Sequence, residues 1–286
     1  MKLSRLAPSI FVLLWSTGFV GAKYGLPYAD PFIFLSLRVF IAALVLFTVA
    51  LFIKSPIAIG RRDLTWSAII GFFLHACYLG GVFFAISQGF SAGVAAVVTS
   101  VQPVLVSLLA VKVLGEKLRS RQIIGLICGF LGVLLVLTPG LSNDLPVSGF
   151  VAILIALLGS TTATLLQKKF GSEIPIISGT AYQYIASAIV LLFAALATGG
   201  TSIQWSGHFI AAFVWLIAVL SVGAVLLLLW LLNTGSAASV SSLFYLVPPA
   251  TAVEAYVLFG ESLTRQEVVG IVVTAIGVWL VVRASS

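Results

Sequence analysis

The sequence repeats itself with a shift of 145 positions over its 286 residues. Residues of the same type recur at this distance through much of the chain: Pro103 and Pro248, Gly115 and Gly260, Glu116 and Glu261, Leu118 and Leu263, Gly125 and Gly270, and Gly132 and Gly277. The same shift aligns Arg38 with Gln183, so the repeat covers nearly the whole chain. We therefore predict a tandem duplication, with one unit over residues 1–141 and a second over residues 142–286.

Composition places both units in a membrane. Hydrophobic residues make up 61% of the chain and charged residues only 8%, whereas about a quarter of the residues are charged in a typical soluble domain. The net charge of +7 does not indicate nucleic-acid binding, because basic residues of membrane proteins mark their cytoplasmic loops. Cys77 and Cys128 lie in apolar segments without the spacing of a disulfide framework or a metal site, so we expect no cofactor and no metal.

Glycines, prolines and charges divide the sequence into ten apolar windows of about the length that spans a bilayer. The windows cover residues 7–26, 31–53, 64–86, 92–114, 122–138, 147–168, 175–198, 209–232, 237–259 and 265–282. The first window follows Lys2 and Arg5 as in a signal peptide, but it is long, interrupted by polar residues and without a convincing cleavage site. We expect an all-α membrane protein with ten transmembrane helices, five in each unit.

The basic residues predict the orientation of these helices. With the amino terminus inside, twelve of the 15 lysines and arginines lie on the cytoplasmic side: Lys2, Arg5, Lys54, Arg61, Arg62, Lys112, Lys117, Arg119, Arg121, Lys168, Lys169 and Arg283. An odd number of helices per unit inserts the second unit upside down and makes both termini cytoplasmic. Inverted repeats of this kind usually form transporters that bind substrate near the membrane midplane and work by alternating access.

Several of these features together resemble one known family. They are the stretch Trp-Ser-Thr-Gly-Phe at residues 15–19, Arg38 in the second window, and the proline followed by Gly-Glu-x-Leu in both units. In these residues the chain is similar to the EamA family of the drug/metabolite transporter superfamily, and within it to bacterial aromatic amino-acid exporters of the YddG type. The resemblance implies an exporter of small organic metabolites in the bacterial inner membrane. Whether the protein is a monomer or a dimer stays open.

Ionisable side chains inside the apolar windows are costly and usually face a cavity or a partner. His75 lies near the middle of the third window, and Tyr78 shares its helical face. This spacing predicts two cavity-lining residues, with a neutral histidine bonded to a neighbouring helix as the alternative. Arg38 and Glu254 lie at similar depths below the outer side. We expect them to form an ion pair, either a gate or a permanent structural pair, with a site for a substrate carboxylate as the alternative.

Polar and aromatic side chains away from the helix ends complete the candidate substrate site. Such a mixture suits a partly apolar organic substrate, although single serines and threonines are as often helix-packing residues. We predict a central cavity with walls from the first, third, fourth, sixth, eighth and ninth windows. Its predicted substrate-binding residues are Trp15, His75, Tyr78, Thr99, Gln102, Thr161, Thr164, Tyr182, Trp230 and Tyr245.

Prolines and glycines predict bends and close helix contacts. Pro103 and Pro248 remove backbone donors in the fourth and ninth windows, so we expect kinks at equivalent depths. These kinks form hinges or site walls, or they are inherited bends without movement. Gly125 and Gly129 in the fifth window, with Gly277 in the tenth, give smooth faces for close helix approach. Packing within the monomer and dimerisation both fit such faces.

Other function classes lack their sequence signatures. The two histidines are separated and the aspartates lie in different connections, so no catalytic set indicates an enzyme. The phosphate-binding loop of ATP-driven pumps is absent from the sequence. No filter-like stretch or ring of like charge indicates a channel, which stays the weaker alternative beside export of drugs or other metabolites. We therefore expect a secondary transporter of small molecules, surrounded by lipid, with amino acids as the favoured substrates.

Overall fold

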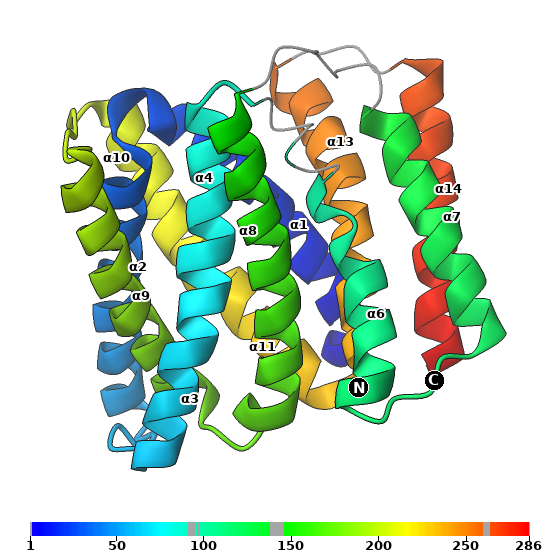
Figure 1. Cartoon of the computed structure of the whole chain (residues 1–286), viewed down its shortest axis with the longest axis horizontal. Coiled ribbons are helices and arrows are strands. Elements are labelled where there is room, and N and C mark those ends of the chain that lie inside the picture. The colour runs from blue at the N-terminus through cyan, green and yellow to red at the C-terminus, as the bar shows by residue number, and fades with distance from the viewer. Residues whose placement is uncertain (1, 91–94, 96–97, 138–145, 260–263, 286) are drawn as a thin grey trace.

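The computed structural model of the chain describes residues 2–90, 95, 98–137, 146–259 and 264–285. Its helices run roughly side by side in one bundle, as Figure 1 shows. The first half contains α1 (Lys2–Gly25), η1 (Leu26–Tyr28), α2 (Pro31–Phe52), α3 (Arg61–Gly71), η2 (Phe72–Leu79), α4 (Gly80–Ser87), α6 (Gln102–Val113) and α7 (Ser120–Leu137). The second half contains α8 (Val147–Leu166), η4 (Gln167–Gly171), α9 (Ile176–Thr198), α10 (Gly207–Trp215), η5 (Leu216–Ala224), α11 (Val225–Thr234), α12 (Ala237–Ser242), η6 (Leu243–Leu246), α13 (Val247–Phe259) and α14 (Arg265–Ser285).

Five helical stretches among the described residues are long and apolar enough to cross a membrane: Pro31–Phe52, Arg61–Ser87, Val147–Gly171, Ile176–Thr198 and Gly207–Thr234. Shorter apolar helices are found at Leu6–Gly18, Gln102–Val113, Ser120–Leu135 and Val268–Arg283. Helical residues thus occur in each of the ten predicted windows, and the prediction of an all-helical membrane protein is confirmed. The count of ten crossings stays a prediction.

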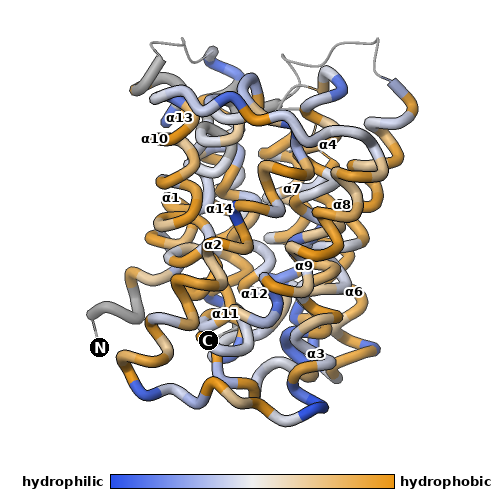
Figure 2. The backbone as a smooth tube through the Cα atoms, turned by 90° about the vertical axis from the view of Figure 1, so that its left-hand side faces the viewer, coloured by the Kyte–Doolittle hydropathy of each residue, from blue (hydrophilic) through white to orange (hydrophobic). Residues whose placement is uncertain are grey.

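Apolar side chains cover the outside of the bundle as well as its core. Leu158, Phe193 and Val214 are 60%, 68% and 56% exposed, which suits contact with lipid rather than water. Figure 2 shows hydrophobic residues along the middle of the bundle and hydrophilic residues concentrated toward its two ends. The protein therefore presents an apolar belt to a bilayer.

Both chain ends lie toward the same end of the bundle (Figure 1). This end also holds the connections that carry Lys54, Arg61 and Lys117. We call it the basic end, and the other the opposite end. Two chain ends on one side require an even number of crossings.

Both prolines for which kinks are predicted lie where the helical geometry changes. The chain turns before Pro103, and α6 begins one residue earlier, at Gln102. In the second unit the short helix α12 tightens into the 3-10 segment η6, and α13 begins at Val247, directly before Pro248. Proline fits the first turn of a helix because the amide there has no acceptor within the helix. Pro103 and Pro248 therefore each lie in the first turn of a helical segment.

Two π-helical segments, η2 and η5, interrupt the crossings Arg61–Ser87 and Gly207–Thr234. Their positions are equivalent, because their last residues, Leu79 and Ala224, are 145 positions apart. In the core, η2 packs against α8 and α9, while η5 packs against α1 and α2. Short π-helical turns occur frequently at functional sites, so the two segments direct attention to the centre of the bundle.

The glycine faces join two helices of the same chain. Helices α7 and α14 pack against each other, and a β-carbon on Gly125 would lie 2.6 Å from the carbonyl oxygen of Gly277. A β-carbon on Gly129 would likewise lie 2.6 Å from the ring of Tyr245 in η6. Of the two roles that fit these faces, packing within the monomer is the one that the structure shows.

Candidate transport site

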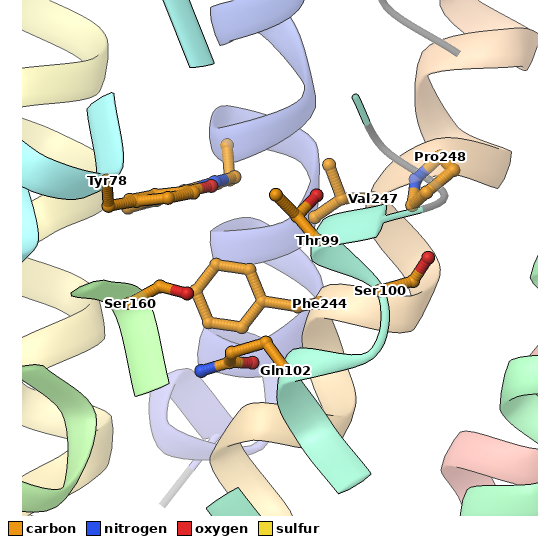
Figure 3. A pocket seen from close by; sticks show the side chains of 9 residues that line it. Tyr78, Thr99, Ser100, Gln102, Ser160, Phe244, Val247 and Pro248 are labelled. Carbon is orange, nitrogen blue, oxygen red and sulfur yellow. The ribbon is translucent and has the colours of Figure 1, made fainter. Parts of the chain in front are cut away.

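A small cavity of about 30 Å³ lies at the centre of the bundle. One part of its wall is polar and comes from η2, α8 and the break before α6: Tyr78, Thr99, Ser100, Gln102 and Ser160. The other part is aromatic and apolar and comes from α1, η6 and α13: Trp15, Phe244, Val247 and Pro248. Figure 3 shows the labelled side chains around this space. Both units therefore contribute to one cavity with two chemically different walls.

The lining residues are related by the internal repeat. Several of them form pairs that are 145 positions apart: Trp15 with Ser160, Thr99 with Phe244, and Gln102 with Val247. Equivalent residues of two units meet only near the axis that relates the units. In each pair one member is polar and the other is apolar or aromatic. Equivalent positions of the two units thus line one cavity, although its chemistry is not symmetric.

The polar wall offers an unoccupied acceptor. The Gln102 side chain donates from Nε2 to the hydroxyl of Thr164 at 3.2 Å, and the Thr164 hydroxyl donates in turn to the carbonyl of Ser160 at 2.9 Å. The Gln102 Oε1 atom is buried and has no hydrogen-bond partner among the described residues. A buried acceptor without a partner is costly, so this oxygen is suited to accept a hydrogen bond from a bound molecule.

The aromatic wall is rigid. The rings of Phe11, Trp15 and Phe244 contact one another in pairs, with centroids 5.3 to 5.4 Å apart. Trp15 and Phe244 meet nearly edge to face at 84°, an arrangement that aromatic pairs favour. Three rings that support one another form a preorganised apolar surface for an apolar group of a ligand.

A second small space of about 30 Å³ adjoins the first, because Trp15 and Tyr78 line both. Its further lining includes Ala22 near the end of α1 and Ile86 near the end of α4. Both helices end at the opposite end of the bundle. The empty space therefore runs from the centre toward the opposite end.

The Gly-Glu sequence of the first unit joins two segments of the chain at the basic end. Gly115 follows α6 with a φ of 69°, a left-handed conformation that glycine adopts without strain. The Glu116 carboxylate accepts hydrogen bonds from the backbone N–H groups of Ala237 at 2.7 Å and Ala238 at 3.4 Å. These amides begin α12 and have no acceptor within their own helix. The equivalent turn at residues 260–263 lies outside the described residues.

A lysine anchors the preceding helix at the same end. The Lys168 ammonium group donates to the carbonyl oxygens of Leu232 at 2.8 Å and Gly235 at 2.6 Å, at the end of α11. Between these anchors a small apolar cluster packs α6, α8 and α12 together: Val106, Ala110, Leu165 and Ala237. The connection from α11 to α12 is therefore held at both of its ends.

The structure brings together part of the predicted substrate site. Trp15, Tyr78, Thr99 and Gln102 line the cavity, as does Pro248, which we predicted as a hinge or wall. Pro103 is buried in α6 behind Gln102. The cavity walls come from the first, third, fourth, sixth and ninth predicted helices, and the eighth contributes Leu220 to the adjoining space.

The other predicted residues lie elsewhere, for different reasons. Thr161 is buried and donates to the carbonyl of Leu157 in its own helix at 2.8 Å. Tyr182 donates to the carbonyl of Ile57 at the basic end at 3.2 Å. Trp230 is 36% exposed on the outside of the bundle, while Tyr245 is fully buried behind the wall. Thr164 reaches the cavity only through Gln102.

His75 does not share the cavity wall with Tyr78, although their spacing predicts it. Both residues lie in η2, which is π-helical. The wider π-helical turn changes the direction of each successive side chain, so residues three apart no longer share a face. His75 instead contacts the ring of Tyr184 in α9, with ring centroids 4.6 Å apart.

The predicted ion pair between Arg38 and Glu254 is wrong. The Arg38 Nε atom donates to the Ser221 hydroxyl at 2.9 Å, whereas the Glu254 carboxylate accepts from the Ser16 hydroxyl at 2.5 Å. Arg38 belongs to α2, which packs on α9 and η5, and Glu254 belongs to α13, which packs on α1. The two residues lie at similar depths along the sequence windows, as predicted, but on different sides of the bundle.

Sequence reasoning missed Ser100, Ser160, Phe244 and Val247 as lining residues. All four could have been found, because Ser160, Phe244, Val247 and Ser100 are the repeat partners of the predicted residues Trp15, Thr99, Gln102 and Tyr245.

Comparisons with known proteins agree with this architecture. The sequence profile of the EamA-like transporter family matches the chain twice, at residues 6–138 and 147–283. The uncharacterized transporter YvbV of Bacillus subtilis is 27% identical over 276 residues, which cover 96% of this chain and 89% of that protein. A probable amino-acid metabolite efflux pump of Salmonella typhimurium is 25% identical, with 95% and 92% covered.

Two further likenesses point the same way. The uncharacterized inner membrane transporter YedA of Escherichia coli K12 is 25% identical, with 96% of this chain and 92% of that protein covered. A solved crystal structure with 19% identity superposes at a TM-score of 0.81 and covers 100% of this chain and 98% of that one, which supports the fold alone. Since the two matches to the family profile span most of the sequence, the chain belongs to the EamA-like transporter family.

Proposed function

We propose that this protein is a secondary transporter that exports small organic metabolites, amino acids with aromatic or apolar side chains above all, across the bacterial inner membrane. Transport proceeds by alternating access between two inverted five-helix repeats, with the basic end and both termini in the cytoplasm. Family membership supports transport. The relative named as an amino-acid metabolite efflux pump supports the substrate class, and the relative named as an inner membrane transporter supports the location.

The observation that carries the proposal is the cavity with two different walls. Trp15 and Phe244 provide an apolar aromatic surface, and Gln102 provides an acceptor without a partner on the other side. An amino acid has a matching division, because its ammonium group donates hydrogen bonds while its side chain is apolar. We expect the ammonium group at Gln102 Oε1 and the side chain against the Trp15 ring. Exporters of aromatic amino acids, such as those of the YddG type, would transport substrates of this kind.

Closure at one end supports alternating access. The empty space extends from the centre toward the opposite end, and the contacts of Glu116 and Lys168 close the basic end. In an inverted repeat the same contacts, made by the equivalent residues of the other unit, would close the other side in the alternate state. With the basic end in the cytoplasm, this state opens outward and releases an exported molecule.

The orientation has its own test. Ala58 lies in the connection between α2 and α3, and Ser202 lies in the connection between α9 and α10; both are exposed. A cysteine at position 202 should react with an impermeant maleimide on intact cells, and one at position 58 only after the cytoplasmic side is opened. The reverse pattern would show that the basic end faces outward.

Transport itself is tested with the purified protein in proteoliposomes. Uptake of a panel of labelled amino acids, measured with and without a proton gradient, should saturate with substrate concentration and need no nucleotide. A flux that rises linearly at channel-like rates would contradict a carrier. No flux of any amino acid, with flux of other metabolites, would remove the proposed substrate class and keep the transporter.

A matched pair of variants links the flux to the cavity. Trp15→Ala removes a ring from the wall, and burial of a large apolar side chain contributes about 1.5 to 3 kcal/mol, so KM for a favoured amino acid should rise about tenfold or more. Trp230→Ala removes the same ring from a position on the outside of the bundle, 36% exposed. Its KM should stay unchanged, and equal effects of both variants would place the binding site elsewhere.

A further inference from the structure

A second polar cluster lies one layer behind the cavity wall, between α2, α9, η2 and η5. Its members are Arg38, His75, Gln183, Tyr184 and Ser221. Each of these side chains is at most 2% exposed. Tyr78 and Leu220, on the same two π-helical segments, line the neighbouring empty space. The cluster is therefore enclosed by protein but close to the transport pathway.

Arg38 places a positive charge in this cluster without a carboxylate beside it. Its Nε atom donates to the neutral Ser221 hydroxyl, and its Nη1 atom is buried without a partner in the described part of the chain. Within the described residues no acidic side chain lies at ion-pair distance from Arg38. Arginine does not lose its proton in proteins, and removing an unpaired charge from water is strongly unfavourable. The guanidinium therefore requires a negative charge that the described chain does not supply.

The groups around Arg38 favour an anion over a water molecule. Among the described residues neither ring nitrogen of His75 makes a hydrogen bond of good geometry, although the Gln183 side chain lies near the ring, and one of the two nitrogens carries a proton in the neutral ring. His75 lies close enough to Arg38 to interact with it electrostatically. Against these donors stands one unpartnered acceptor, Gln183 Oε1. A water molecule would satisfy hydrogen bonds but leave the charge unpaired, whereas an anion satisfies both requirements.

We propose that this cluster binds one small monovalent anion between Arg38 and His75. Chloride from the medium and the carboxylate group of a transported amino acid share this chemistry, and the second source rests on the proposed function. Gln183 is the repeat partner of Arg38, so the second unit has no equivalent charge at this position. The anion site belongs to one unit only.

Thermal unfolding of the purified full-length protein in detergent tests the site. The reference buffer contains methanesulfonate as its anion, and chloride, phenylalanine or phenylalaninamide is then added at constant ionic strength. The amide lacks the carboxylate and distinguishes the two sources. Arg38→Gln removes the charge and copies the residue of the second unit. Arg62→Gln, at a position whose side chain is 68% exposed, is the control for loss of an arginine.

Binding of an anion predicts a saturable rise of several degrees in the Tm of the parent protein, by chloride, by phenylalanine or by both. Arg62→Gln should show the same rise. Arg38→Gln should melt at least as high as the parent in methanesulfonate, because an unpaired charge is gone. It should gain nothing from chloride, and it should gain less than the parent from phenylalanine, whose ammonium group and ring can still bind the central cavity. His75→Gln should need about tenfold more ligand for half of the rise, since it weakens one hydrogen bond to a charged group.

Three results would overturn the site. One is no rise in the parent protein with either anion. Another is a rise in the Tm of Arg38→Gln equal to the rise in the parent protein. The third is a Tm of Arg38→Gln that lies below that of the parent by the same amount in every buffer, because groups of the protein itself would then stabilise the guanidinium. If Arg38→Gln cannot be purified, equal half-saturation of the parent and His75→Gln overturns it. Unfolding needs no transport, so failure here leaves the proposed function standing.

Discussion

Replacing Glu116 with glutamine should open the basic end of the bundle. The carboxylate accepts from the Ala237 amide at 2.7 Å, and its bond to Ala238 is long at 3.4 Å, so we count only the first. Hydrogen bonds to charged groups contribute about 1.5 to 3 kcal/mol, compared with about 0.5 to 1.5 kcal/mol for neutral ones. Glutamine keeps the shape and one acceptor oxygen but loses the charge. The expected loss is about 1 to 2 kcal/mol, a shift of about 5- to 30-fold toward the state that is open at the basic end.

A cysteine inside the closed region reports this shift. Val106 is fully buried in the apolar cluster at the basic end. In a background with Cys77→Ala and Cys128→Ala, the variant Val106→Cys should react with a maleimide about 5 to 30 times faster when Glu116→Gln is added. Glu173→Gln is the matched control, because Glu173 is an acid at the same end that is 83% exposed and lies 3.9 Å from Arg62.

The inverted repeat makes the test sharper. Glu261 is the repeat partner of Glu116, and in the proposed mechanism it closes the opposite side in the alternate state. Glu261→Gln should therefore slow the labelling of position 106, while Glu116→Gln accelerates it. The reasoning is refuted if Glu116→Gln labels no faster than Glu173→Gln. It is also refuted if the two glutamine variants change the rate in the same direction.

Two further predictions concern packing and partners. Gly125→Ala should lower the free energy of unfolding by about 1 to 3 kcal/mol, because its β-carbon would lie 2.6 Å from a backbone oxygen. Gly207→Ala should have little effect, because the space around Gly207 is open. Equal Tm values for the two variants would contradict the close contact of α7 and α14. In double-mutant cycles on stability, Ser16→Ala and Glu254→Gln should be coupled by about 0.5 to 3 kcal/mol, while Arg38→Gln and Glu254→Gln should be additive within about 0.5 kcal/mol. Coupling of the second pair would restore the ion pair that the structure excludes.

Features that follow from position along the chain could be predicted from the sequence. Apolar length identified the helices, because the bilayer sets the number of apolar residues in a crossing. Pro103 and Pro248 marked the breaks, because proline removes a donor wherever it occurs in a helix. Gly125 marked a close contact, although only the structure showed that its neighbour, Gly277, belongs to the same chain.

Features that depend on direction around a helix axis could be predicted only in part. Arg38 and Glu254 had the right depth, but depth does not tell on which side of a helix a residue lies. His75 and Tyr78 had α-helical spacing, but the π-helical turn of η2 separated their directions, and no residue type marks such a turn. Trp230 shows the same limit, because a ring suits a lipid-facing surface as well as a cavity wall.

Comparison of the two units separates scaffold from recognition. Where the units agree, in the prolines and the glycines, the residues shape the backbone, and they do so equally well in either orientation. A cavity on the axis between identical units would bind a molecule equally well in two opposite poses. The units differ where side chains face the cavity or the buried cluster: Trp15 and Ser160, Gln102 and Val247, and Arg38 and Gln183. These differences make one wall polar, one wall aromatic and one side charged. A molecule with distinct ends then binds in a single pose, and in the proposed mechanism it keeps that pose while the scaffold around it alternates.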